Sequence, residues 1–334
     1  MKLILYIEIL FMRGDFCVTR ANYSTRLMVR CAKMYYEDNM NQDEISEILQ
    51  VSKSTVSRIL AAARNKGIVK IIVDNPLKDD YIQLEKEIES KFGLKEVIIV
   101  DSGNDAKETK RNLGKAAAEY IQRIMKDGQI IGVTWGTTLK EIPQFVENDR
   151  KRKVTFIPML GGIGEAEIDI HPNQIALQLA KKFNAESKLL HAPYQVDSME
   201  RKESLISDKN IWEFFKLFDN IHVALIGIGS PLLNTSTLVE SGYYTMEDIK
   251  MLVRQGAVAD ISSLFIDKDG NGDKFEFNNR VVGIDLERIK KIPLTIGIAG
   301  SIEKRDAILA AIRGNYIRVL IVDEVAARSM LKEN

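Results

Sequence analysis

Four loops rich in glycine or hydroxyl residues carry the side chains most able to hold a small anion. They are Gly136-Thr137-Thr138, Gly161-Gly162-Ile163-Gly164, Gly227-Ile228-Gly229-Ser230 and Gly300-Ser301. Glycine lets the backbone approach a ligand closely, and N–H groups and hydroxyls at a helix start can hold a phosphate. Each loop alone is also typical of an ordinary strand-to-helix turn, so only their combination favours an anionic ligand. None is a full G-x-G-x-x-G or Walker A motif, which disfavours dinucleotide and ATP sites.

These loops follow apolar segments that predict β-strands. The predicted strands are 96–101, 130–135, 154–160, 222–228, 294–299 and 319–323, and the predicted helices are 105–126, 138–148, 172–183, 246–254 and 303–313. Apolar strands separated by helices predict an α/β domain with a mostly parallel sheet covered on both faces. The loops at the carboxyl ends of such strands meet at one edge, where these folds bind ligands. We expect Thr137 and Thr138 to open a helix there, and Lys304 to add a positive charge.

A second functional pattern is the segment NQDEISEILQVSKSTVSRIL at residues 41–60. Its apolar spacing predicts two short helices that share a core across a tight turn, with Asn41 and Ser52 as N-caps. This is a helix-turn-helix, whose second helix reads base edges in the DNA major groove. The expected DNA-contacting residues are Gln42, Ser52, Lys53, Ser54, Thr55, Ser57 and Arg58.

The charge around this motif supports DNA binding. From Ser52 to Lys70 there are five basic residues and no acidic ones. A local positive excess suits DNA because phosphate contacts dominate affinity. The alternative interpretation is an ordinary helical hairpin with a solvated basic face.

Length and composition indicate how many domains the chain has and what charge they carry. The 334 residues suggest two or three domains, and the 47 basic residues are balanced by 47 acidic ones. The rest of the chain must then be neutral to acidic, which suits a small-molecule sensor. Two cysteines, Cys17 and Cys31, form neither a disulfide framework nor a metal-binding spacing. The lack of a disulfide framework indicates a reducing compartment, so we expect a cytoplasmic location. The three histidines are dispersed, so we expect no metal and no cofactor.

The predicted organisation has four parts. They are an N-terminal extension at 1–23, a winged-helix-like helix-turn-helix domain at 24–75, a linker helix at 76–93 and an effector domain at 94–334. The first dozen residues resemble a signal peptide, but Glu8 interrupts the apolar run, so we interpret them as an N-terminal extension. No later run approaches the roughly 18 apolar residues that span a membrane.

Inside these parts, local signals predict further features. A support helix is expected at 26–38, Gly67 should end the recognition helix, and 68–74 reads as a strand that could form a wing. The linker carries an apolar stripe that could pack on the next domain or on a partner's linker. Its residues are Tyr81, Leu84, Ile88 and Phe92.

Residues 267–278, DKDGNGDKFEFN, match the first half of a calcium-binding loop. The twelfth position should be a bidentate glutamate and is Asn278. Phe275 and Phe277 alternate with polar residues, so a polar hairpin turn is the better interpretation.

The order of motifs resembles a known family. The helix-turn-helix is followed by TWGTTL, LGGIGE, HAPYQVDS, ALIGIGS, GAVADISSLFIDKDG and AGSIEKRDAILAAIRGNYIRVLIVDE. Over roughly residues 26–330 the chain resembles the SorC family of bacterial sugar-responsive regulators. The resemblance implies a sensor domain related to sugar-phosphate isomerases, a phosphorylated sugar or sugar-like effector, and a tetramer.

The resemblance also implies a set of effector-binding residues. Phosphate contacts would fall on Gly136, Thr137, Thr138 and Lys304, while Gly161, Gly162, Asn173, Gly227, Gly229 and Asp267 would line the pocket. Some relatives have a lysine before the double glycine that can form an imine with an aldehyde sugar. This chain has Leu160 there, which argues against covalent capture.

Two functions from different classes follow. One is a regulator of a carbohydrate-metabolism operon that binds operator DNA as a homo-oligomer, either dimer or tetramer. The other is an isomerase-like enzyme with a DNA-binding appendage. An isomerase needs a positioned general base and a proton shuttle, usually a carboxylate and a histidine. Because His171, His191 and His222 are not paired with acids at the glycine-rich loops, we favour the regulator.

Overall fold

The computed structural model describes residues 23–71, 81–147, 151–162, 168–232, 237–240 and 242–332. Predictions that fall on the extension up to residue 22, on residues 72–74, and on Ile163 and Gly164 lie outside the described residues. The chain divides into two compact units, Met1–Lys78 and Asp79–Asn334. The described part of the first unit is helical, and the second unit contains the sheet.

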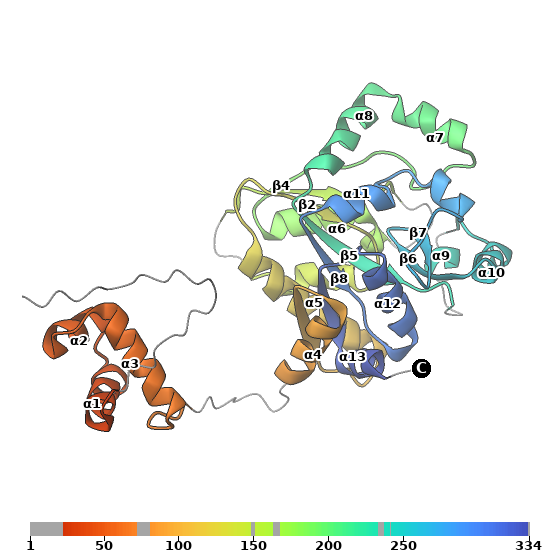
Figure 1. Cartoon of the computed structure of the whole chain (residues 1–334). Helices are drawn as coiled ribbons and strands as arrows, with labels where there is room; N and C mark the ends of the chain where they lie inside the picture. Colours follow the sequence, from red (N-terminus) through yellow and green to blue (C-terminus); the bar gives the residue numbers. More distant parts are fainter. Residues whose placement is uncertain are drawn as a thin grey trace, which may run out of the picture. The chain divides into compact units, whose positions relative to one another are not determined.

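The described residues of the first unit form three helices, α1 (Thr25–Tyr36), α2 (Gln42–Leu49) and α3 (Lys53–Asn65), which Figure 1 shows grouped together. They share one small core. Its fully buried members include Met28, Cys31, Ile45, Val56 and Ile59. The apolar faces predicted for the helix-turn-helix therefore do meet, and α1 is the expected support helix.

Both predicted N-caps of this unit are confirmed. The Asn41 side-chain oxygen accepts from the N–H groups of Asp43 and Glu44 at 2.9 and 3.0 Å, and the Glu44 carboxylate accepts from the Asn41 N–H at 2.8 Å. Ser52 Oγ accepts from the Thr55 N–H at 3.2 Å. Each cap satisfies N–H groups that the first turn of a helix leaves unpaired. The helix starts are thus fixed by side chains that the sequence identifies.

The predicted strand at 68–74 is wrong for its described residues, 68–71, which form no strand. Gly67 adopts the left-handed conformation expected after a helix, with φ +70°. The N–H groups of Gly67 and Ile68 then bond back to Arg64 and Ala63 at 3.0 and 2.9 Å. These bonds close the end of α3. Ile68 and Val69 pack against the helical core instead of pairing with another strand.

The described residues of the second unit include a sheet of nine strands. Seven are parallel, in the order β1-β9-β8-β5-β2-β3-β4, and a hairpin of β6 and β7 pairs antiparallel with the end of β5. The strands are β1 (Glu96–Val100), β2 (Ile130–Val133), β3 (Thr155–Pro158), β4 (Glu186–Ser187), β5 (Val223–Gly229), β6 (Ala257–Ile261), β7 (Leu264–Asp267), β8 (Leu294–Ile298) and β9 (Val319–Asp323). The mostly parallel α/β fold is therefore confirmed.

Helices cover both faces of this sheet. The α-helices are α4 (Ile82–Phe92), α5 (Ala106–Ile124), α6 (Pro172–Lys182), α7 (Met199–Ile206), α8 (Lys209–Phe215), α9 (Thr237–Glu240), α10 (Met246–Arg254), α11 (Leu286–Lys291), α12 (Arg305–Arg313) and α13 (Glu324–Leu331). The 3₁₀ helices are η1 (Leu139–Phe145), η2 (Ile168–Ile170), η3 (Lys216–Asn220), η4 (Glu276–Arg280) and η5 (Ile302–Lys304).

Successive strand residues enter different cores. In β1, Val97 and Ile99 belong to the core on one face, which takes residues from α4, α8, α11, α12 and α13. Ile98 and Val100 pack against the other core, which is built with α5, η1 and α6. This alternation follows from the two-residue period of a strand and explains why the strands read as continuously apolar.

Helix α4 packs on the sheet of its own unit. Ile88 is fully buried, and Tyr81, Leu84 and Phe92 pack against the same core. The N–H groups of Val97 and Ile99 on the edge strand β1 donate to the carboxylates of Glu89 and Glu85, each at 2.9 Å. Of the two alternatives for the apolar stripe, the structure therefore favours packing on the sheet domain over packing on a partner's linker.

Two helices differ from their predictions in type. Residues 138–148 were expected to be α-helical, but the segment is the 3₁₀ helix η1, with Pro143 inside it. Proline lacks the N–H that the helix interior requires, so a regular α-helix is disfavoured. The helix expected at 303–313 starts as the short turn η5 and becomes α-helical only at Arg305.

The hairpin expected at 267–278 is also wrong. The hairpin lies earlier, where β6 and β7 are joined by Ser262 and Ser263 with φ of 55° and 62°. Two positive φ values are typical of a type I′ turn, which usually contains Asn-Gly, so the serines hid it. Asp267 accepts from the N–H groups of Asp269 and Asn271 and pairs with Lys274 at 2.9 Å.

We predict that Ile88→Ala destabilises the sheet unit by about 2–5 kcal/mol, because it leaves a cavity at a fully buried site. Urea unfolding followed by tryptophan fluorescence measures the change. Glu87→Ala, on the exposed face of α4, is the matched control and should change stability little. A loss of stability that appears only on dilution would instead place Ile88 at an interface between copies.

Candidate functional site

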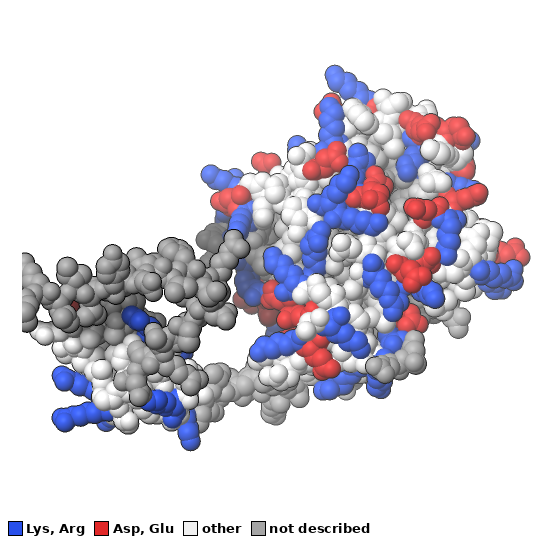
Figure 2. All heavy atoms as spheres, viewed as in Figure 1, with Lys and Arg blue, Asp and Glu red and all other residues white. Residues whose placement is uncertain are grey.

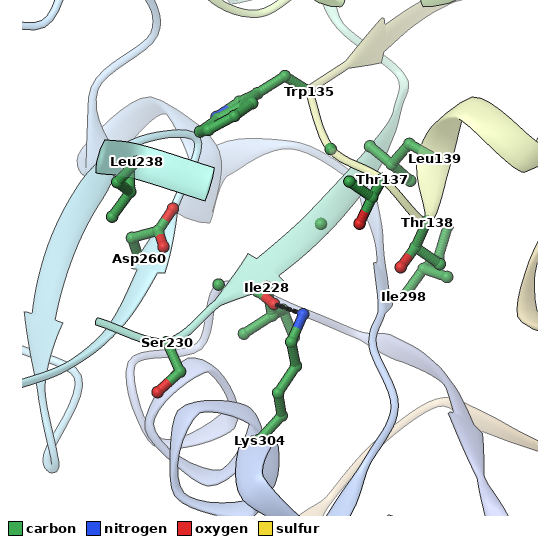
Figure 3. A pocket seen from close by; sticks show the side chains of 13 residues that line it. Trp135, Thr137, Thr138, Leu139, Ile228, Ser230, Leu238, Asp260, Ile298 and Lys304 are labelled. Atoms are coloured by element: carbon green, nitrogen blue, oxygen red, sulfur yellow. Dashed lines mark hydrogen bonds between the residues drawn. The ribbon is translucent and has the colours of Figure 1, made fainter. Parts of the chain in front are cut away.

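A cavity lies where the order of the parallel strands reverses, between β2 and β5. From β2 the chain continues outward to β3 and β4, whereas β8 and β9 lie on the other side of β5. Loops that leave neighbouring strands in opposite directions open a crevice at their carboxyl ends. The cavity is lined by Trp135, Gly136, Thr137, Thr138, Leu139, Gly227, Ile228, Gly229, Ser230, Leu238, Asp260, Ile298 and Lys304. Figure 3 shows this arrangement.

Six of the predicted effector-binding residues line this one cavity. They are Gly136, Thr137, Thr138, Gly227, Gly229 and Lys304. Gly136 has φ +139°, which residues with a side chain rarely adopt. The Gly227 N–H donates to Thr134 Oγ1 at 3.0 Å, which joins the ends of β5 and β2. The glycines therefore shape the backbone around the cavity.

The other four predicted residues do not line it. Gly161 packs closely on backbone, because a Cβ atom there would lie 2.4 Å from the Pro193 carbonyl oxygen. Gly162 forms a bridge with the same Pro193. The Asn173 amide donates to and accepts from the Leu190 backbone, each at 3.0 Å. Asp267 is held by its own loop and by Lys274, as described above. In this structure, the contacts of these four residues are therefore with other parts of the protein and not with the cavity.

Asp260, which the sequence reasoning missed, is a buried carboxylate in the cavity wall. It comes from the β6–β7 hairpin and lies against β5, since a Cβ atom at Gly229 would lie only 1.9 Å from Asp260 Oδ1. Burial raises its pKa to about 6, opposed by the Lys304 charge and a hydrogen bond from the Ser263 backbone. Its signal in the sequence is one acid within the apolar run AVADI.

Lys304 brings a half-buried ammonium group to the same cavity. Its Nζ donates to the Ile228 carbonyl oxygen at 2.8 Å, the dashed line in Figure 3. The pKa of this lysine is lowered, chiefly by burial and also by the nearby charge of Lys110, while the Asp260 carboxylate opposes this shift. An ammonium has three N–H donors, so donors beyond the bond to Ile228 can serve a ligand.

Two threonines stand opposite Lys304. Thr138 precedes η1 but makes no side-chain capping bond to it. Figure 3 shows the hydroxyls of Thr137 and Thr138 on the side of the cavity toward Lys304. Because η1 is a short 3₁₀ helix, its dipole adds less than an α-helix would. Hydroxyls, nearby N–H groups and the lysine are thus the main donors for an anion.

An aromatic wall closes another side. The indole N–H of Trp135 donates to Ser263 Oγ at 2.9 Å, and the Trp135 ring stacks on Tyr194 with ring centres 6.5 Å apart. These contacts hold the ring in one orientation. A fixed aromatic surface beside polar groups suits an amphipathic ligand such as a sugar.

The candidate DNA-contacting residues lie at the N-cap and first turns of α3, except Gln42, which begins α2. Ser52, Lys53, Ser54, Ser57 and Arg58 are exposed, and Thr55 and Gln42 are partly exposed. Arg58 donates to the Ser54 carbonyl oxygen and to Thr55 Oγ1, at 3.2 and 3.3 Å. Lys53 pairs with Asp43 of α2 at 2.7 Å. Arg58 is therefore aligned along its own helix, while Asp43 offsets part of the Lys53 charge.

Charge is distributed differently on the two units. In the view of Figure 2, basic and acidic side chains are interspersed over the face of the sheet unit, whereas the visible charges of the helical unit are mostly basic. A face on which basic side chains predominate attracts a polyanion more than a face of interspersed charges does. This supports the helical unit as the nucleic-acid interface.

Other kinds of site receive no support within the described ranges. No group of three or more His, Cys, Asp or Glu side chains there could hold a metal ion. No described helix is long and apolar enough to cross a membrane. The described residues around the cavity include one carboxylate and one lysine but no histidine.

Comparisons with known proteins agree with this architecture. Residues 78–332 match the family described as "Putative sugar-binding domain", and residues 30–66 match "Sigma-70, region 4". The chain is 31% identical to the deoxyribonucleoside regulator of Bacillus subtilis, covering 92% of this chain and 98% of that protein. It is 29% identical to the sorbitol operon regulator of Klebsiella pneumoniae, covering 92% and 98%.

The solved structures lead to the same group of proteins. The full-length sorbitol operon regulator SorC of Klebsiella pneumoniae matches with a TM-score of 0.72 and 29% identity, covering 92% of this chain and 99% of that one. A DeoR family transcriptional regulator from Listeria monocytogenes matches with a TM-score of 0.69 and 33% identity, covering 76% and 100%. A helix-turn-helix joined to a matching sugar-binding domain along nearly the whole chain establishes that it belongs to the SorC family of sugar-responsive transcriptional regulators.

Proposed function

We propose that this chain binds operator DNA through α2 and α3, and that a phosphorylated sugar or related metabolite in the cavity controls this binding. The observation that carries the proposal is the convergence of Lys304, Thr137 and Thr138 on one cavity at the reversal of strand order. A dianion there would face an ammonium, two hydroxyls and backbone N–H groups. Such charge-assisted hydrogen bonds are stronger than neutral ones.

The two sides of the cavity suggest one orientation for this ligand. A phosphate is repelled by Asp260, so its place is beside Lys304 and Thr138. A carboxylate accepts hydrogen bonds, so Asp260 suits the hydroxyl groups of a sugar. Trp135 offers its ring to the apolar face of the sugar, and Ser230 adds a further hydroxyl. The cavity thus pairs a cationic end with a hydroxyl-accepting end.

The alternative, an isomerase-like enzyme, would need Asp260 as its general base. A carboxylate whose pKa is about 6 could accept a proton near neutral pH. A second acid or a histidine to shuttle that proton is absent from the described lining. The relatives are named as regulators, which also supports a sensor. Incubation with sugar phosphates separates the two functions: turnover supports the enzyme, and saturable binding without turnover supports the sensor.

We predict that a true effector at 100 times its dissociation constant stabilises the sheet unit by about 2.7 kcal/mol. Thr138→Val keeps the side-chain shape but removes the hydroxyl, and Lys304→Met keeps the stem but removes the charge. Both variants should bind sugar phosphates more weakly. Thermal shifts across a panel of phosphorylated sugars, followed by titration calorimetry, measure this loss.

Thr155→Val is the matched control, because Thr155 begins β3 at the opposite edge of the sheet. It should respond to the panel as the parent does. If Thr138→Val and Lys304→Met also respond like the parent, the phosphate binds elsewhere. The unphosphorylated sugar should stabilise the parent less, since it lacks the dianion.

For the DNA interface, we predict that Arg58→Ala weakens binding by about 1–3 kcal/mol if Arg58 reads a guanine. If it contacts only phosphate, binding falls similarly on all sequences and the salt dependence becomes shallower. Fluorescence anisotropy with a duplex selected by the protein from random DNA measures both. Arg201→Ala, which removes one exposed charge from the sheet unit, is the control. Unchanged binding by Arg58→Ala and Lys53→Ala would exclude α3 as the reading helix.

We also propose that the chain acts as a homo-oligomer, either dimer or tetramer. One helix-turn-helix contacts few base pairs, so two half-sites are normally read together. Light scattering at micromolar concentration should give at least twice the 37.8 kDa chain mass. A monomer both with and without DNA would contradict this proposal.

A further inference from the structure

The hydroxyl group of Tyr81 lies between two carboxylates. It donates to Asp101 Oδ1 at 2.6 Å and lies 3.1 Å from Glu324 Oε2. Tyr81 immediately precedes α4 and is the first described residue of the sheet unit. In the sequence it follows the segment that leads from the helix-turn-helix. These contacts therefore anchor the start of the sheet unit to the residue that follows β1 and to the first residue of α13.

This anchor has two possible arrangements. A phenol has one hydrogen to donate, so Asp101 and Glu324 compete for it. Burial and both carboxylates raise the pKa of Tyr81, so the phenol stays protonated. Arg328 also donates to Glu324, at 2.7 Å, and can hold it when the tyrosine turns to Asp101. A small displacement of Glu324 would shift the balance between the two acceptors.

The neighbour of Glu324 connects this anchor to the loop after β8. Asp323 is 2% exposed and accepts from the Ser301 N–H at 2.8 Å and from Ser102 Oγ at 2.6 Å. Ser102 Oγ in turn accepts from the Val325 N–H at 3.2 Å. The buried Asp323 carboxylate therefore joins the start of α13 to Ser301, which begins the turn toward Lys304.

That turn is held in an uncommon conformation. Ser301 has φ +85°, a strained region that residues with a side chain rarely adopt. The bond from Asp323 supports it. The Ser301 carbonyl oxygen accepts from the N–H of Lys304 at 3.1 Å, and Lys304 lines the cavity. A change at Lys304 thus acts on a turn that Asp323 holds in place.

We propose that the contacts Lys304–Ser301–Asp323 and Glu324–Tyr81 form a relay from the effector cavity to the start of α4. The proposal rests on the proposed function, because the trigger is an anion at Lys304. Anion binding draws Lys304 toward the cavity, moves the turn at Ser301 and shifts the start of α13 through Asp323. Glu324 then changes its share of the Tyr81 hydrogen bond. An effector shifts this balance only as far as it prefers one arrangement.

Hydrogen–deuterium exchange of the full chain, with inorganic phosphate as the probe, tests the relay. In the parent, phosphate should slow amide exchange at residues 136–139 and 302–305 and change exchange severalfold within Ile82–Phe92. Tyr81→Phe removes only the hydroxyl, and Ser102→Ala loosens Asp323. Both should keep the slowing at the cavity and lose the change in α4.

Tyr316→Phe is the matched control, since the Tyr316 hydroxyl donates to a single acceptor, the Gly270 carbonyl oxygen, at 2.8 Å. It should keep both responses. Slowing at the cavity without a change in α4 of the parent overturns the relay alone, as does an α4 response that survives in Tyr81→Phe and Ser102→Ala. Failure of phosphate to slow exchange at the cavity overturns the phosphate site and the relay together.

Discussion

The reversal of strand order between β2 and β5 is the constraint on which the site depends. Parallel strands can be connected only by crossovers, and the sequence supplies helices for both faces of the sheet. The connection that follows β2 runs toward β3, whereas β5 has β8 on its other side. No described helix therefore covers the carboxyl ends of both β2 and β5. The segments that meet there are the loop after β2, the end of β5 and the turn after β8. The cavity is thus a consequence of topology, and its chemistry follows from the few side chains placed at that edge.

Those side chains include a buried carboxylate, Asp260, and a half-buried ammonium, Lys304. Burial of such charges is costly, and their attraction offsets only part of that cost. Charged groups in a cavity wall, rather than apolar side chains, are what a site for a charged, hydroxyl-bearing ligand requires. A ligand that carries both an anion and hydroxyl groups supplies partners for both. The position of Asp260 also requires glycine at position 229, because the Asp260 carboxylate occupies the space that a side chain would need.

Regular periodicity made most of the fold predictable. The six predicted strands are six of the seven parallel strands, because a strand buried on both faces must be apolar throughout. Asn41, Ser52 and Gly67 were identified because caps depend on local backbone needs. β4 was missed because it has only two residues, and the β6–β7 hairpin because its turn contains serines. The strand expected at 68–74 was inferred from apolar residues, of which the described Ile68 instead bonds back to Ala63 and helps to close the end of α3.

The site was predictable only where the chemistry lies in loop motifs. Gly136, Thr137, Thr138 and Lys304 follow strands in the sequence, so topology brings them together. Asp260 lies in a strand of the hairpin, and no local pattern shows that this hairpin folds over β5. The family resemblance implied Asn173 as a pocket residue, and in this structure its amide bonds to the backbone of Leu190, 17 residues away in the sequence. Contacts between distant segments are what sequence patterns do not reveal.

The two carboxylates of α4 that bond to β1 also limit how copies of the chain can associate. An open sheet edge is a template for another strand, and proteins cover such edges to avoid uncontrolled aggregation. Here Glu85 and Glu89 occupy N–H groups of β1 that an added strand would need. At the other edge, β4 offers only two residues. Within the described residues, the homo-oligomer proposed above would therefore form through helical and loop surfaces rather than through sheet edges, which favours an association of finite size.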